Sequence, residues 1–208
     1  KPISNLEIDG SMIITSREAL ELPIIPSPIL ILGGGATGVE FAYLYASFGA
    51  DVTLVELKDN ILPNEDEEIS NQLVYELTKL GVTIHTNTTI GQVDKTPSTV
   101  LVTMQTPTGN EQLVYQKVLV AAGIEGNTDN IGLEDIGIET SRSFVDVNEY
   151  MRTNISTIYA IGDVTGKMPL AHVASAQAII AVENIAGIPT SPIDYKNMPK
   201  ATYSNPQI

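Results

Sequence analysis

The sequence predicts an α/β fold, with a three-layer domain that contains a parallel sheet and an antiparallel excursion. The apolar run at residues 29–32 is typical of a strand that is covered on both faces of a parallel sheet. A glycine cluster at residues 33–38 follows directly, and apolar residues at helical spacing then lead to a second apolar run at residues 52–56. Strand, glycine turn, helix and strand in this order form a βαβ unit.

Composition supports a globular protein and excludes several classes of function. The 208 residues are 43% hydrophobic and 17% charged, which is enough apolar material for a substantial core. Asp and Glu outnumber Lys and Arg by 25 to 11, so the net charge of -14 disfavours nucleic acid as a partner. Cysteine is absent, which excludes a disulfide, a thiolate metal site and a thiol nucleophile within these residues. No apolar run approaches the roughly 20 residues of a membrane span, so we expect a soluble chain.

Two helices are predicted in the first half of the chain. The first follows the glycine cluster and ends near Gly49, with apolar residues at Val39, Phe41, Ala42, Leu44, Tyr45 and Phe48. The second runs from about Asp66 to Leu80 and ends at Gly81. Its expected core face consists of Ile69, Leu73, Val74, Leu77 and Leu80.

The middle of the chain is predicted to form further strands. Residues 82–85 are a third strand candidate, and the Thr- and Val-rich residues 88–115 predict an antiparallel excursion. Turn residues interrupt this excursion at 96–97 and at 106–109. Residues 117–121 then return as another apolar strand.

The second half of the chain is predicted to contain a domain boundary, a strand and a helix. The polar, glycine-containing residues 123–137 predict a loop and a domain boundary. Residues 158–161 are expected to form a buried strand, and residues 170–186 an apolar, alanine-rich helix. The tail from Pro189 has no regular pattern.

The glycine turn is the main candidate binding feature. Gly33, Gly35 and Gly38 form G-x-G-x-x-G, in which the first glycine permits a tight turn, the second lets backbone approach a pyrophosphate and the third lets the helix pack on the strand. Glu56 ends the second strand, where a carboxylate accepts hydrogen bonds from an adenosine ribose and repels a 2′-phosphate. The pattern therefore predicts NAD binding rather than NADP binding. The alternatives are a purely structural turn and a solvated acid at a strand end.

The other polar candidates carry less information. Glu40 is expected in the first helical turn, where the helix dipole alone favours a carboxylate, so a structural role is about as well supported as a functional one. His85 and His172 are the two histidines, which is too few and too distant in sequence to predict a metal site.

Four ordered motifs resemble the pyridine nucleotide-disulfide oxidoreductase family. They lie at residues 14–20, 33–42, 159–164 and 170–172, and within the family they are most similar to the dihydrolipoamide dehydrogenases. The resemblance implies a Rossmann-like NAD-binding domain plus part of an FAD-binding domain. It assigns residues 1–25 to the end of the first FAD-domain segment, 26–122 to the NAD-binding domain, 123–190 to the second FAD-domain segment and 191–208 to the start of an interface domain for dimerisation.

The resemblance also implies individual cofactor contacts. For NAD the matching positions are Gly33, Gly34, Gly35, Ala36, Thr37, Gly38, Val39, Glu40, Glu56, Ile90 and Gly123. Glu40 matches a glutamate near the nicotinamide and flavin rings. For FAD, Asp163 matches the aspartate that binds the ribityl chain, and Pro169, Leu170, Ala171 and His172 match the segment that presents backbone to the isoalloxazine. Without the resemblance, Asp163 would read as a turn residue after a strand.

The family's chemistry sets the functional expectation. The resemblance implies an intact homodimeric enzyme, cytoplasmic or in the mitochondrial matrix of a eukaryote, that oxidises dihydrolipoamide on a lipoyl carrier domain and passes electrons through a disulfide and FAD to NAD. The family's N-terminal FAD fingerprint, its C-x-x-x-x-C disulfide and its C-terminal His-Glu pair have no counterpart here. We therefore expect an inactive central fragment that binds NAD and has an incomplete FAD site.

One motif departs from the family pattern, and two rival functions stay open. Many members have G-R-x-P-N after the returning strand, where this chain has residues 123–127, Gly-Ile-Glu-Gly-Asn, and so lacks one cation near the cofactors. The rivals are an NADH oxidase or other flavin disulfide reductase, and a non-catalytic NAD-binding module.

Overall fold

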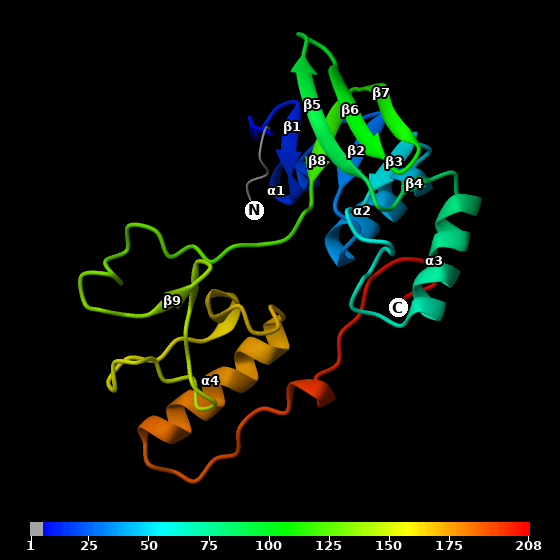
Figure 1. The fold of residues 1–208 in the computed structure, drawn as a ribbon. Helices are drawn as coiled ribbons and strands as arrows, with labels where there is room; N and C mark the ends of the chain where they lie inside the picture. The colour runs from blue at the N-terminus through cyan, green and yellow to red at the C-terminus, as the bar shows by residue number, and fades with distance from the viewer. Residues whose placement is uncertain (1–5) are drawn as a thin grey trace. The chain divides into compact units, whose positions relative to one another are not determined.

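The computed structural model describes residues 6–208, which form two compact units (Figure 1). The first unit comprises the chain up to Gly123 together with Ala201–Ile208, and the second comprises Ile124–Lys200. The start of the predicted segment 1–25 lies outside the described residues. The predicted assignment of the four segments to domains stays a prediction.

The first unit is built on a five-stranded parallel sheet. Its strands are β1 (Ile13–Thr15), β2 (Ile29–Leu32), β3 (Val52–Val55), β4 (Thr83–His85) and β8 (Lys117–Val120). The order across the sheet is β1-β8-β2-β3-β4. β2 thus lies in the middle, between β8 and β3, and is completely paired on both sides.

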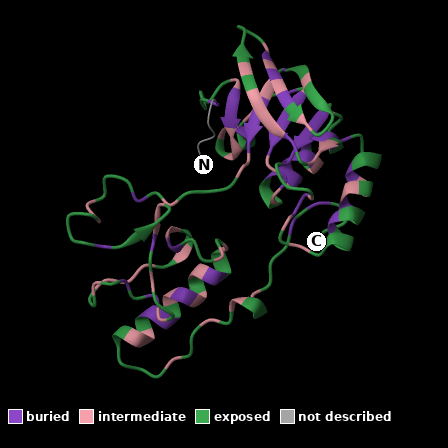
Figure 2. Ribbon diagram, viewed as in Figure 1, coloured by how far each residue is buried: buried purple, intermediate pink, exposed green. Residues whose placement is uncertain are grey.

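The alternation of side chains along β2 explains why the strand reads as a continuous apolar run. Ile29 and Ile31 belong to one buried cluster, and Leu30 and Leu32 belong to the other. Successive side chains of a strand point to opposite faces, so both faces of this sheet are covered (Figure 2).

Different layers cover the two faces. On one face, α2 (Ala36–Ser47) and α3 (Glu67–Lys79) pack through Val39, Leu73 and Leu77, among other residues. The opposite cluster contains Val100, Val102 and Met104 of the antiparallel sheet, whose strands are β5 (Thr89–Lys95), β6 (Val100–Thr106) and β7 (Gly109–Tyr115). The predicted α/β class, with three layers and an antiparallel excursion, is confirmed.

The core face of α3 is narrower than the sequence pattern indicates. Leu73 and Leu77 are buried together with Ser70, whereas Ile69 and Leu80 are 42% and 40% exposed. Residues at 70, 73 and 77 follow the i, i+3, i+7 spacing of one helical stripe. The expectation that Ile69 and Leu80 belong to the core face was therefore wrong.

β1 and the short helix α1 (Ser16–Leu20) that follows it were not predicted from the sequence. β1 pairs with β8, about a hundred residues further along the chain. Thr15 and Glu18 form a capping box at the start of α1, in which the Glu18 carboxylate accepts the Thr15 backbone N–H at 2.8 Å. The hydrogen bond that the Thr15 hydroxyl donates to Glu18, together with this backbone bond, lowers the pKa of the Glu18 carboxyl.

Asp9 organises the turn before β1. Its Oδ1 accepts backbone hydrogen bonds from Ser11, Met12 and Ile13, and its Oδ2 accepts the Lys95 ammonium of β5 at 2.9 Å. Burial alone would raise the pKa of Asp9, but these donors together hold it well below its ordinary value. The carboxylate therefore links the start of the parallel sheet to the antiparallel layer.

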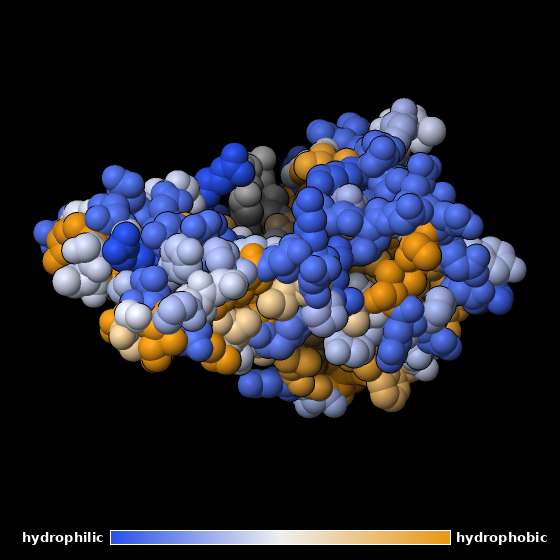
Figure 3. All heavy atoms as spheres, turned by 90° about the horizontal axis from the view of Figure 1, so that it is seen from below, coloured by the Kyte–Doolittle hydropathy of each residue, from blue (hydrophilic) through white to orange (hydrophobic). Residues whose placement is uncertain are grey.

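The second unit contains the short hairpin of β9 (Thr140–Ser141) and β10 (Phe144–Val145), the 3₁₀ turns η1 (Gly162–Thr165) and η2 (Tyr195–Asn197), and the helix α4 (Ala171–Ile185). α4 confirms the predicted helix, and η2 is a short regular turn in a tail expected to have none. Three apolar residues of α4, Ile179, Val182 and Ile185, are 60–63% exposed. Figure 3 shows apolar side chains interspersed among hydrophilic ones on the molecular surface.

The predicted strand at residues 158–161 was wrong. Tyr159 forms an isolated bridge with Arg152, and Ile161 is 40% exposed. The backbone N–H and C=O groups of a strand need hydrogen-bond partners on a neighbouring strand. Within the described residues, the bridge to Arg152 is the only strand-like pairing that residues 158–161 make. An apolar run alone does not supply such a neighbour.

Candidate functional site

The main cleft lies at the carboxyl ends of three parallel strands. The chain leaves β2 through α2 and continues to β3 on one side, while β8 lies on the other side of β2. This reversal is a topological switch point, the position at which open α/β sheets bind ligands. The cleft has a volume of about 730 Å³. It is lined by Leu32, Gly33, Gly35, Ala36, Thr37, Val55, Glu56, Leu57, Lys58, Pro63, Thr88, Thr89, Ile90, Ala121, Ala122 and Gly123.

The three motif glycines differ in the space that a side chain would have at each position. Gly33 has a φ of +114°, and a Cβ there would lie 2.5 Å from the Ala121 carbonyl oxygen. A Cβ on Gly38 would overlap the Gly33 carbonyl oxygen, because α2 packs directly against the turn. A Cβ on Gly35 would have no atom within 4 Å. The first and third glycines are therefore required by the fold, whereas the second borders open space in the cleft.

The N-terminus of α2 adds hydrogen-bond donors at this place. Gly35 is the N-cap residue in an extended conformation, and no side chain caps this end of the helix. The N–H groups of a first helical turn have no partner inside the helix, and they carry the positive end of the helix dipole. Such a terminus next to an open glycine is suited to an anionic group.

Glu56 holds the glycine turn in addition to lining the cleft. The residue is 9% exposed, and its Oε2 accepts the Gly34 N–H at 2.6 Å while its Oε1 accepts the Lys58 N–H at 2.8 Å. A Cβ on Gly34 would lie 3.0 Å from the Cβ of Glu56, so the turn packs closely on this side chain. From the sequence, Glu56 was predicted to contact a ribose, with a solvated acid as the alternative, and this anchoring role was not predicted.

Two other predicted residues line the same cleft, and two are found elsewhere than expected. Ile90 of β5 and Gly123, which follows β8, both line the cleft although they lie far apart in sequence. Val39 is fully buried in the core and does not line it. Glu40 was expected in the first turn of the helix, but α2 begins at Ala36 and has no acidic residue in its first turn. Instead, Oε1 of Glu40 accepts the Tyr203 N–H at 2.9 Å.

Nine residues that line the cleft were not singled out as site residues from the sequence, and four of them lie more than two residues beyond the end of a parallel strand. These four are Lys58, Pro63, Thr88 and Thr89, from the loops that follow β3 and β4 and from the start of β5. Their positions follow from the backbone: the Thr88 N–H donates to the Glu56 carbonyl and the Asn87 N–H donates to the Lys58 carbonyl. Loop residues that follow parallel strands were the available signal, because these loops surround the carboxyl edge of a sheet.

The second unit contains the residues predicted for FAD. Asp163 is exposed in η1, and α4 begins after Leu170 without a side-chain cap. Gln177, which is buried in α4, accepts the Gly162 N–H at 2.6 Å and donates to the Tyr195 hydroxyl at 3.1 Å. This amide fixes the η1 turn next to α4. Nε2 of His172 lies 2.9 Å from the Pro199 carbonyl oxygen.

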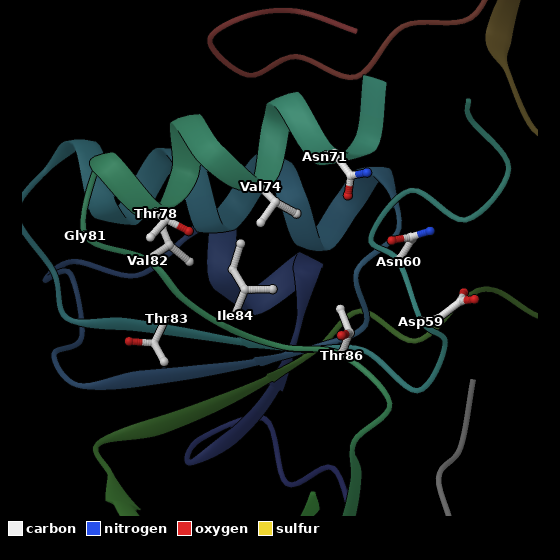
Figure 4. A pocket seen from close by; sticks show the side chains of 10 residues that line it. All are labelled: Asp59, Asn60, Asn71, Val74, Thr78, Gly81, Val82, Thr83, Ile84 and Thr86. Carbon is white, nitrogen blue, oxygen red and sulfur yellow. The ribbon is translucent and has the colours of Figure 1, made fainter. Parts of the chain in front are cut away.

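A second hollow of about 500 Å³ lies between α3 and the edge strand β4 (Figure 4). Val74 of α3 and Ile84 of β4 point toward each other across its floor, and Asn60 and Asn71 lie at one end. None of the predicted site residues lines this hollow.

Within residues 6–208, no group of three or more His, Asp or Glu side chains is arranged to hold a metal ion. No helix in the described part of the chain is long and apolar enough to cross a membrane.

Comparison with known proteins identifies the family. Residues 2–178 match the family described as pyridine nucleotide-disulphide oxidoreductase. The chain belongs to this family. This match confirms the family resemblance that the sequence motifs predicted. The similar solved structures have the same α/β fold with a Rossmann-like sheet.

Similar curated proteins are named dihydrolipoyl dehydrogenase. Dihydrolipoyl dehydrogenase of Mycobacterium leprae (strain TN) is 42% identical over 198 residues, which is 94% of this chain and 42% of that protein. Dihydrolipoyl dehydrogenase of Bacillus subtilis (strain 168) is 41% identical over 207 residues, 99% of this chain and 44% of that protein. The chain thus spans less than half the length of these curated relatives.

Solved structures agree with this family assignment. LpdA from Mycobacterium tuberculosis has a TM-score of 0.90 at 32% identity, covering all of this chain and 45% of that one. The HOCl-induced flavoprotein disulfide reductase RclA from Escherichia coli has a TM-score of 0.87 at 29% identity, covering all of this chain and 47% of that one.

Proposed function

We propose that this chain is the NAD-binding part of a dihydrolipoamide dehydrogenase, and that it binds NAD in the cleft at the carboxyl ends of β2, β3 and β8. The observation that carries the proposal is the combination of an open Gly35, an uncapped α2 N-terminus and the Glu56 carboxylate at one topological switch point. These features are suited to a pyrophosphate next to a ribose diol.

Each group has a separate role in this proposal. Gly35 and the first turn of α2 receive the pyrophosphate, since a bare backbone and a helix N-terminus accommodate negative charge at close range. Glu56 accepts hydrogen bonds from the adenosine ribose while it keeps the Gly34 N–H, because a carboxylate has about four acceptor positions and two are used here. Ile90 and Gly123 border the cleft on the side of β5 and β8. When bound, NAD supplies hydride transfer.

Calorimetric titration of the 208-residue chain tests this proposal. We expect NAD to bind more tightly than NADP, since the Glu56 carboxylate repels a 2′-phosphate. Glu56→Gln keeps the size of the side chain and one acceptor oxygen but removes the charge, so it is expected to weaken NAD binding and to narrow the preference over NADP. Glu21→Gln, at an exposed position after α1, serves as the control and should change neither affinity. A folded chain that binds no NAD at millimolar concentration would contradict the proposal.

For the whole protein we propose the oxidation of dihydrolipoamide, held on a lipoyl carrier domain, with electrons passing through FAD to NAD in a homodimer. The support is the family and the dihydrolipoyl dehydrogenase names of relatives about 40% identical. This chain has no cysteine and so supplies no thiol for the first step. The exposed Asp163 and the uncapped α4 N-terminus are suited to a ribityl hydroxyl and to the flavin ring, as one part of an FAD site.

The FAD part of the proposal makes a visible prediction. Within the described residues, the single G-x-G-x-x-G turn lies in the NAD cleft, which leaves no second turn for the FAD pyrophosphate. A partial site still has to offset the roughly 4 to 15 kcal/mol of translational and rotational freedom that is lost on binding. The purified chain should therefore be colourless, and absorbance at the flavin bands measures this. Stoichiometric bound FAD would show that Asp163 and α4 suffice.

A further inference from the structure

Lys58 lines the cleft, and its side chain has no role in the proposed binding of NAD. Lys58 is the single cation among the residues that line the main cleft, in a chain where acidic residues outnumber basic ones by more than two to one. Throughout the described chain, the ammonium of Lys58 makes no hydrogen bond and no ion pair. Its positive charge is therefore available to a ligand.

The backbone of Lys58 is fixed although its side chain is free. The Lys58 N–H donates to Oε1 of Glu56 at 2.8 Å, and the Lys58 carbonyl accepts the Asn87 N–H at 2.8 Å. Glu56 is in turn fixed by the Gly34 N–H at 2.6 Å. The flexible side chain thus starts from a fixed point beside the carboxylate that is proposed to meet the ribose.

We propose that Lys58 determines how strictly this chain selects NAD over NADP, by pairing with a phosphate on the 2′ position of the adenosine ribose. The inference rests on the proposed NAD site. Glu56 repels a 2′-phosphate from a buried, fixed position, and Lys58 attracts the same phosphate from an exposed one. The two charges act in opposite directions on one substituent, so the chain discriminates against NADP less strongly than Glu56 alone would.

The effect of Lys58 is specific to the phosphorylated ribose. NAD carries a neutral hydroxyl at the 2′ position, and an exposed ammonium gains little from it in water. A phosphate offers a full charge, and exposed ion pairs contribute up to about 1 kcal/mol, which corresponds to a change of about fivefold in affinity. This attraction weakens with salt, because the Debye length falls to about 3 Å at 1 M.

Titration of three variants with four ligands tests the inference. The variants are Lys58→Gln, Lys58→Arg and the control Lys79→Gln, which removes an exposed lysine at the end of α3. The ligands are NAD, NADP, adenosine 2′-monophosphate and adenosine 5′-monophosphate. We expect Lys58→Gln to weaken binding of NADP and of the 2′-monophosphate about fivefold at low salt, and to change NAD and the 5′-monophosphate by less than twofold. Lys58→Arg should keep the affinity for both 2′-phosphates, and Lys79→Gln should have no effect.

The possible failures are distinguishable. If the unsubstituted chain binds no NAD, the proposed function and this inference both fall. If NAD binds and Lys58→Gln leaves the affinity for NADP unchanged, only this inference is overturned. An equal loss for NAD and NADP also overturns it, because Lys58 would then contact the diphosphate that the two dinucleotides share. A loss for NADP that persists at 1 M salt contradicts the exposed ion pair.

Discussion

Alanine at Gly38 and alanine at Gly35 should separate the structural and the binding roles of one motif. A Cβ on Gly38 would overlap the Gly33 carbonyl oxygen, and it would also lie 3.0 Å from the Gly33 carbonyl carbon and 3.5 Å from the Cβ of Ala121. Backbone and a buried helix would both have to move. Overpacking a core costs about 1–3 kcal/mol, so we expect Gly38→Ala to lower the free energy of unfolding by about 3 kcal/mol.

Gly35→Ala should behave in the opposite way. The φ of -75° at this residue is open to any amino acid, and a Cβ would meet no atom within 4 Å. The change in the free energy of unfolding should stay within about 1 kcal/mol, because alanine is a poorer N-cap than glycine but restricts the unfolded chain. Affinity for NAD should nevertheless fall at least tenfold, since the methyl group occupies the space proposed for the pyrophosphate.

Two measurements decide between these expectations. Urea unfolding, with hydrogen exchange of residues 29–47 as the local probe, gives the stability of the first unit, and calorimetry gives the affinity for NAD. The reasoning is refuted if Gly38→Ala unfolds at the urea concentration of the unsubstituted chain. It is also refuted if Gly35→Ala loses as much stability as Gly38→Ala, or binds NAD unchanged.

Three further changes test the packing and the electrostatics of the first unit. Asp9→Asn removes the ion pair with Lys95, and it should lower the free energy of unfolding by about 0.5 kcal/mol at pH 7. Because the folded pKa of Asp9 is depressed, this contribution is complete above the ordinary pKa of about 4 and is lost progressively as the pH falls toward the folded pKa, so the urea midpoints of the two proteins should begin to converge below about pH 4. Tyr45→Phe leaves the Ala19 carbonyl without its 3.0 Å hydrogen bond and should cost about 1 kcal/mol in urea unfolding. Leu73→Ala, at a fully buried position, should cost about 2–5 kcal/mol in the same assay.

Each of these three has an outcome that would contradict it. A difference between Asp9→Asn and the unsubstituted chain that persists unchanged at pH 2.5 would mean that the carboxylate charge is not responsible. An unchanged urea midpoint for Tyr45→Phe would mean that the hydroxyl bond is replaced by water. A loss below 1 kcal/mol for Leu73→Ala would mean that α3 is packed loosely on the sheet.

The βαβ unit could be predicted because its signals are local. The turn after β2 requires glycine at Gly33 and Gly38 for reasons that lie within a few residues, and Gly49 ends α2 with a φ of +85°. The apolar runs of β2 and β3 follow from coverage of both sheet faces, which is a property of any parallel sheet.

The features that were missed depend on distant partners. β1 is three residues long, and its strand conformation is imposed by pairing with β8. Residues 158–161 have the composition of a strand, but one bridge to Arg152 is all the pairing they find within the described chain. No pattern in the sequence states which neighbour a strand will have.

The candidate site was predicted as a set of positions but not as a set of contacts. The sequence indicated that the glycine turn and Glu56 belong together, and the structure shows them joined by a hydrogen bond from the Gly34 N–H. The carboxylate's second bond, from the N–H of Lys58, depends on how the loop after β3 turns back. Loop geometry of this kind depends on tertiary contacts, such as the bond between Asn87 and Lys58, that a single sequence does not reveal.

The strand order has a consequence for how the chain folds during its synthesis on the ribosome. β8 is the last strand of the parallel sheet to be synthesised, yet it lies between β1 and β2, which are made about a hundred residues earlier. Until β8 emerges, the edge of β2 that it will occupy presents unpaired backbone and an apolar surface, and β1 lacks the strand with which it pairs within the described residues. A translation pause before residue 117 would extend the time for which this edge of β2 is unpaired. Strands of other nascent chains can pair with such an edge. Insertion of β8 between β1 and β2 therefore closes this open edge of β2 and completes the parallel sheet.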